Sequence, residues 1–82
     1  MEYFIGQIIL MPNKYIPKGF LVCNGRELTI GNHSALASVL GYNYNDTTGK
    51  FRIPTKTSDV QGYSYCICYD GTFPNKDDNE SK

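Results

Sequence analysis

The sequence has no net charge and no long hydrophobic run, and it contains a single histidine. Eight Lys and Arg residues balance eight Asp and Glu residues, so we expect no basic field that would draw the chain to polymeric nucleic acid or to a membrane. Residues 1–10 contain no basic side chain, and Gly6 and Gln7 interrupt their apolar run. This segment predicts neither a signal peptide nor a membrane span, and the chain is expected to be soluble where it is made.

The chain also lacks the length for more than one domain. A chain of 82 residues buries only a modest share of its unfolded surface, so a lone subunit would have a thin margin of stability. Disulfides, a structural metal or oligomerisation are the usual remedies. We expect a single domain over residues 1–74 that associates with copies of itself, followed by a disordered polar tail over residues 75–82.

Cysteine is present in an odd number. The three residues Cys23, Cys66 and Cys68 argue against a closed framework of disulfides and fit a reducing compartment. With His33 they make four potential zinc ligands. The C-x-C spacing of Cys66 and Cys68 is not the common C-x-x-C, however, so packing in the core is the favoured role and no cofactor is predicted.

Local patterns predict a small α+β domain of short strands with one short helix packed on them. Strands are expected over residues 3–10, up to Pro12, and over residues 20–23, where Asn24-Gly25 makes a tight turn that reverses the chain. A brief extended piece covers residues 51–53. Alternating residues 63–70 predict a last strand that is apolar on both faces and therefore central in its sheet.

The helix is predicted from four apolar residues. Ala35, Leu36, Val39 and Leu40 fall on one side of a helix of two to three turns. Gly31 and Asn32 are suited to begin it, and Gly41 to end it in the left-handed conformation.

The order of these signals resembles that of a known family. Pro17-Lys18-Gly19-Phe20 with Cys23-Asn24-Gly25 is similar to the family's opening, and Leu40-Gly41-Tyr42-Asn43-Tyr44 to its middle. The stretch Thr47-Thr48-Gly49-Lys50-Phe51-Arg52-Ile53-Pro54 and the closing Gly71-Thr72-Phe73-Pro74 resemble its later segments. These four segments, in this order, resemble the phage tail collar domain, which also occurs in the microcystin-dependent proteins of bacteria.

The sequence departs from that family in three ways. Asn24 and Thr55 stand where the family usually has aspartate, which puts any role of those acids in doubt. The long insertion before the closing strand is reduced to residues 55–62. The long trimeric stem of a tail fibre is not seen in these residues, which favours the expectation of a free-standing module.

Candidate binding residues lie on predicted loops and strand ends. Tyrosine rings stack on bases or sugars, guanidinium groups hold phosphates, and ammonium groups attract them. The predicted ligand-binding residues are Arg26, Tyr42, Tyr44, Thr47, Lys50, Arg52 and Lys56. No catalytic motif accompanies His33, and Cys23 is expected to be buried, so we predict that the chain is not an enzyme.

Two functions from different classes fit these residues. The favoured one is a phage-encoded homo-oligomer in the cytoplasm of the infected host that sequesters a small anionic ligand, for instance a cyclic nucleotide immune signal. The alternative is an accessory protein of the virion tail fibre or baseplate that binds host glycan or completes tail assembly.

Overall fold

The computed structural model describes residues 3–42 and 49–74. Its elements, in chain order, are β1 (Ile8–Pro12), the 3-10 turn η1 (Asn13–Tyr15), β2 (Phe20–Val22), β3 (Glu27–Thr29), α1 (Ser34–Val39), β4 (Lys50–Arg52) and β5 (Tyr63–Cys68). The described part is a small mixed fold with one short helix, as expected, although strands dominate it. Tyr44, Thr47 and the polar tail 75–82 lie outside the described residues.

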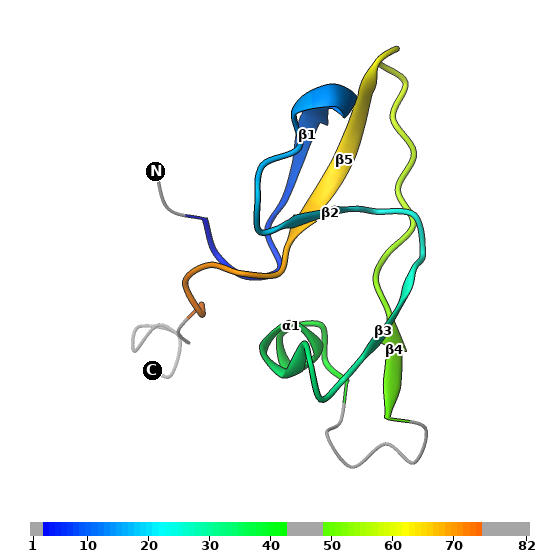
Figure 1. Ribbon diagram of the computed structural model, residues 1–82. Helices are drawn as coiled ribbons and strands as arrows, with labels where there is room; N and C mark the ends of the chain where they lie inside the picture. The colour runs from blue at the N-terminus through cyan, green and yellow to red at the C-terminus, as the bar shows by residue number, and fades with distance from the viewer. Residues whose placement is uncertain (1–2, 43–48, 75–82) are drawn as a thin grey trace, which may run out of the picture.

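The strands form two antiparallel sheets. One sheet has the order β1-β5-β2, and the other consists of β3 and β4. In Figure 1 the two-stranded sheet and α1 lie together below the three-stranded sheet. β5 pairs with β1 on one side and with β2 on the other, with Ile67 opposite both Ile8 and Leu21. The prediction of a central last strand is confirmed, and its side chains alternate between the two faces of the sheet.

The first strand begins later than predicted, whereas it ends at Pro12 as expected. Gly6 has φ +93°, a conformation that side chains with a Cβ rarely adopt, and the amide of Gln7 donates to the Phe4 carbonyl in a turn (2.9 Å). Regular pairing therefore begins only at Ile8. At the other end Pro12 still pairs with Tyr63, because an edge strand tolerates a residue without an N–H.

The turn at Asn24-Gly25 connects the two sheets. Gly25 adopts φ +76°, as its sequence context predicts, and the Asn24 side-chain oxygen accepts a hydrogen bond from the Arg26 amide (3.1 Å). The predicted reversal of the chain does not bring β2 and β3 together, because the two strands pair with different partners. Figure 1 shows the chain bending from β2 into β3 instead.

The helix is shorter than the sequence predicts. It begins at Ser34, because the amides of Asn32 and His33 both donate to the Thr29 carbonyl in the preceding turn. Its end follows the prediction: Gly41 has φ +90°, its amide donates to the Ser38 carbonyl (3.1 Å), and the Tyr42 amide donates to that of Ala37 (2.8 Å). This pair of bonds is the Schellman arrangement, which satisfies carbonyls at the end of a helix.

Two clusters of buried side chains lie on opposite faces of the three-stranded sheet. The first packs against α1 and the second sheet and contains Ile5, Cys23, Ile30, Leu36, Ala37, Phe51, Ile53 and Ile67. The second contains Phe20, Cys66 and Cys68, with Tyr3, Ile9, Met11, Ile16 and Val22 packed around them. Leu36 and Ala37 are the deepest residues of the helix.

All three cysteines are buried and unpaired, which confirms their predicted place in the core. Cys23 belongs to the first cluster, whereas Cys66 and Cys68 belong to the second, so the sheet separates them. Within the described ranges no group of three His, Cys, Asp or Glu side chains is placed to hold a metal ion. Over the same residues no helix has the length and apolar character that crossing a membrane requires.

Candidate functional site

The second sheet exposes two of the four predicted cationic residues, Lys50 and Arg52. Arg52 lies opposite Glu27 and Lys50 opposite Thr29 in the antiparallel register. Phe51 between them is buried in the first cluster. Because side chains alternate along a strand, Lys50 and Arg52 share the outer face of β4. The strand β4 therefore places two cations on one surface.

Arg52 is held in place from two directions. One terminal nitrogen of its guanidinium, Nη1, donates to the Gly25 carbonyl (3.0 Å). The hydroxyl of Tyr42 donates to the Arg52 carbonyl at 3.4 Å, a long bond. The hydrogen bond to Gly25 thus occupies one of the five N–H donors of the Arg52 guanidinium. A ligand would meet the remaining donors.

Tyr42 joins the helix to this sheet. The Schellman bond from its amide fixes its backbone at the end of α1. Its ring packs at a tilt on Phe51, with 5.4 Å between ring centroids. Tyr42 remains 40 % exposed. The structure therefore places Tyr42 beside the backbone of Arg52.

Arg26 and Lys56 take separate positions. The carbonyl of Arg26 accepts a hydrogen bond from the Ile53 amide (3.1 Å). Arg26 therefore extends the pairing of β3 with β4, just before β3 begins. Its side chain is exposed. The amine of Lys56 lies 4.8 Å from the centroid of the Tyr65 ring on β5. This cation–π contact directs Lys56 to the three-stranded sheet. Tyr44 and Thr47, the other two predicted residues, lie outside the described ranges.

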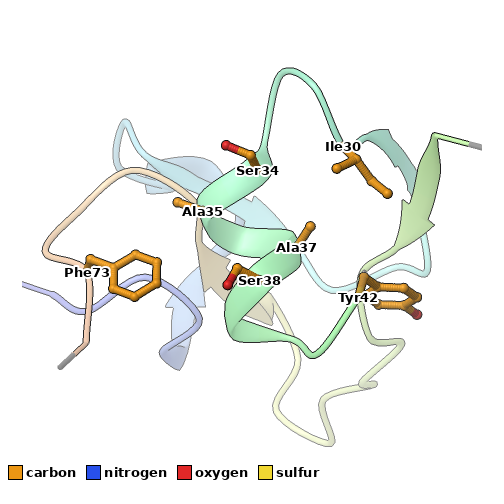
Figure 2. A pocket seen from close by; sticks show the side chains of 7 residues that line it. All are labelled: Ile30, Ser34, Ala35, Ala37, Ser38, Tyr42 and Phe73. Atoms are coloured by element: carbon orange, nitrogen blue, oxygen red, sulfur yellow. The ribbon is translucent and has the colours of Figure 1, made fainter. Parts of the chain in front are cut away.

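A groove that sequence analysis missed runs over α1. Figure 2 shows Ser34, Ala35 and Ser38 along the helix, with Phe73 on one side and Tyr42 on the other. Ile30 and Ala37 complete the lining of this groove of about 450 Å³. None of the described residues that line it is charged. The signal that could have found it is the set of small residues on both sides of Leu36, together with an aromatic residue that follows the last strand. The small residues are Ser34, Ala35, Ala37 and Ser38.

The nucleophilic side chains are withdrawn from solvent. Burial raises the pKa of all three thiols, and the neighbouring Cys66 raises that of Cys23 further while Lys56 opposes this shift. At neutral pH these thiols are therefore protonated and weakly nucleophilic. The His33 ring packs edge-on against Tyr69, with 5.6 Å between centroids. Its Nδ1 is buried and has no hydrogen-bond partner among the described atoms.

Comparison with known protein families identifies a match. The family model described as the phage tail collar domain matches residues 6–64, which is well over half of the 82 residues. No curated protein and no solved structure matches the chain.

Proposed function

Because this chain belongs to the phage tail collar domain family, we propose that it is a non-enzymatic, tail-associated component of a phage particle that binds to copies of itself. The match over residues 6–64 carries the proposal. The match supports the alternative function, an accessory protein of the virion tail, better than it supports sequestration of a small ligand. The virion tail is therefore the proposed location, in place of the host cytoplasm.

Exposed apolar side chains support self-association. Phe73 is 48 % exposed and Tyr42 is 40 % exposed, and the two rings flank the small side chains of α1 (Figure 2). Small residues allow a neighbouring backbone or ring to approach closely. A second copy placed over this groove would remove both aromatic rings from water, which is favourable in proportion to the apolar area covered.

The absence of enzymatic activity is proposed from the state of the reactive groups. The thiols are buried and protonated at neutral pH, as described above. The His33 ring contacts Tyr69 rather than a nucleophile. General acid–base or covalent catalysis needs such groups within hydrogen-bond reach of a substrate.

The tail role is tested by locating the protein. Particles of the encoding phage are purified on a density gradient, and tails are separated from capsids. Antibody against the chain should then label the tail fraction in a fixed ratio to a major tail protein. Detection only in the soluble lysate of infected cells would contradict the proposal.

Self-association is tested by light scattering on the purified protein. The variant Ser38→Arg, which places a charge in the groove, should shift the mass toward that of a single chain. Thr57→Arg adds the same charge at an exposed position of the 55–62 loop and should leave the mass unchanged. A monomeric parent protein at micromolar concentration would contradict this part of the proposal.

Sequestration of a small anionic ligand stays a prediction. The residues that bear on it are Arg26 and Arg52 near the Gly25 turn, together with Tyr42. The family match does not support it. Calorimetric titration with a panel of cyclic nucleotides tests it. A heat of binding that is lost in the Arg52→Gln variant would make the cytoplasmic role a competing proposal again.

A further inference from the structure

A second pocket lies where three segments distant in the sequence meet. It has a volume of about 360 Å³, and its lining includes Tyr3, Pro17, Lys18, Phe20, Asp70 and Thr72. These residues come from the N-terminal segment, the loop before β2 and the segment after β5. None of them belongs to the predicted ligand-binding set.

Backbone hydrogen bonds fix the walls of this pocket. The Thr72 amide donates to the Tyr3 carbonyl, and the Ile5 amide donates to the Thr72 carbonyl, both at 2.9 Å. The Gly19 carbonyl accepts from the amide of Tyr69 (2.8 Å). Gly71 leaves no room for a side chain, since an added Cβ would meet the Tyr3 carbonyl and approach the Cys68 sulfur to 2.9 Å. A site with fixed walls loses less entropy when a ligand binds.

The pocket combines an aromatic wall with one cationic and one anionic side chain. The Tyr3 ring packs edge-on against Phe20, with 5.1 Å between centroids and 86° between planes. Phe20 is buried, whereas Tyr3 is only half-buried, so part of Tyr3 stays accessible. Across residues 3–42 and 49–74, no hydrogen bond or ion pair engages the Lys18 amine or the Asp70 carboxylate.

We propose that this pocket binds one neutral hexose-type sugar unit of a cell-surface glycan. A sugar ring has apolar C–H faces that pack on an aromatic ring, and its hydroxyls both donate and accept hydrogen bonds. Asp70 accepts from these hydroxyls, and Lys18 donates to them. The volume lies at the lower end of the range for small-molecule sites, which is roughly 300–1,000 Å³ and fits one sugar unit.

Charge distinguishes a neutral sugar from the other small ligands considered for this chain. The ammonium of Lys18 and the carboxylate of Asp70 cancel, so the pocket has no net attraction for a phosphate group. An anion would also face the Asp70 carboxylate directly. The assignment to a cell-surface glycan rests on the proposed tail function, because a tail component meets the host surface.

The test is a titration followed by amide resonances of the uniformly ¹⁵N-labelled chain. The probes are the methyl glycosides of glucose, galactose and N-acetylglucosamine, with adenosine monophosphate and glycine as comparators. We expect a dissociation constant of about 1 mM for at least one glycoside, with saturable shifts at residues 18–20 and 70–72. Asp70→Asn and Lys18→Gln should each weaken binding about tenfold, because each removes a charged hydrogen-bonding partner.

Matched variants serve as controls. Asp59→Asn and Lys14→Gln make the same chemical changes at exposed positions outside the pocket and should leave the affinity unchanged. Equal weakening in these controls would overturn the assignment of the site. So would saturable shifts confined to α1 and Tyr42, tighter binding of the nucleotide or glycine, or the absence of binding by every glycoside.

The experiment separates the two proposals. Methyl glycosides are used because a sugar within a glycan has no free anomeric hydroxyl. Sugar binding by a chain absent from purified tails would contradict the tail function and the cell-surface source of the sugar, and it would leave the sugar-binding pocket itself supported. A chain present in tails that binds no glycoside would contradict only the pocket.

Discussion

The two faces of the β1-β5-β2 sheet are covered in different ways. One face packs against α1 and the β3–β4 ribbon, which complete a cluster of eight buried residues among those described. The other face has three buried residues and is covered by Ile16 of a loop and Tyr3 of the N-terminal segment, with half-buried neighbours around them. Regular elements thus close the first cluster, whereas irregular chain closes the second.

The two faces therefore differ in what they contribute to the protein. The first cluster removes the most apolar surface from water, so we expect it to dominate the stability of the domain. The second cluster supports the wall of the sugar pocket, because Phe20 belongs to both. Changes on the first face should therefore affect folding, whereas changes around the second face should affect binding at a smaller cost in stability.

The largest effect should come from shortening the helix side chain at the centre of the first cluster. Leu36 is fully buried, and Leu36→Ala should lower the free energy of unfolding by about 2–5 kcal/mol through lost burial and a cavity. Val22→Ala on the second face, where Val22 is only half-buried, should cost less than half as much. Urea denaturation followed by circular dichroism measures both, and equal losses would contradict the division between the faces.

A smaller effect should come from overpacking the second face. In Gly71→Ala the new methyl group meets the Tyr3 carbonyl and the Cys68 sulfur, which should cost about 1–3 kcal/mol. The control Gly31→Ala meets only the Thr29 methyl at 4.0 Å and should change stability by less than about 0.5 kcal/mol. If thermal unfolding shows the two variants to be equally stable, the walls of the pocket are not fixed as described.

Because of the buried thiols, we expect the free energy of unfolding to depend on pH in the alkaline range. Burial raises the pKa of Cys66 in the folded state, so below the thiol's ordinary pKa both states are protonated and pH has no effect through this group. Above that pKa the unfolded chain releases the proton first, and stability falls by at most about 1.4 kcal/mol per pH unit for each thiol.

Removing a thiol tests this dependence. Cys66→Ala should therefore lose stability less steeply than the parent protein between pH 8 and pH 10, as measured by urea midpoints. The tyrosines and lysines are the same in both proteins, so the difference in slope isolates the thiol. Parallel pH profiles would show that this thiol has the same pKa in the folded and unfolded states.

The smallest effect should come from the cation on the Tyr65 ring. Lys56→Gln removes the cation–π contact at 4.8 Å and should cost about 0.5–1 kcal/mol. It also removes the charge that lowers the pKa of Cys23, so the Cys23 thiol should titrate at higher pH. Lys14→Gln provides a control with the same loss of charge, and a matching loss of stability there would exclude the specific contact.

The candidate site shows what local sequence patterns can predict and what they cannot. The sequence predicted a brief extended piece over residues 51–53 and cations near it, but the structure showed that Lys50 and Arg52 share one face of β4 opposite Thr29 and Glu27. The sequence did not predict that Arg52 reaches back to the Gly25 carbonyl or that Lys56 lies over Tyr65. Each of these contacts joins residues that are distant in the chain, and no local period contains that information.

The sequence by itself determined the family, the central position of the last strand, the left-handed end of the helix at Gly41 and the burial of the three cysteines. These features depend on side-chain periodicity, on the backbone freedom of glycine and on apolar character, all of which act over a few residues. The tertiary structure alone decided where β1 begins, how Asn24-Gly25 connects two sheets, and that residue 3, residues 17–20 and residues 70–72 enclose a pocket. Those outcomes depend on which distant backbone groups pair, and pairing is selected by the packing of the whole domain.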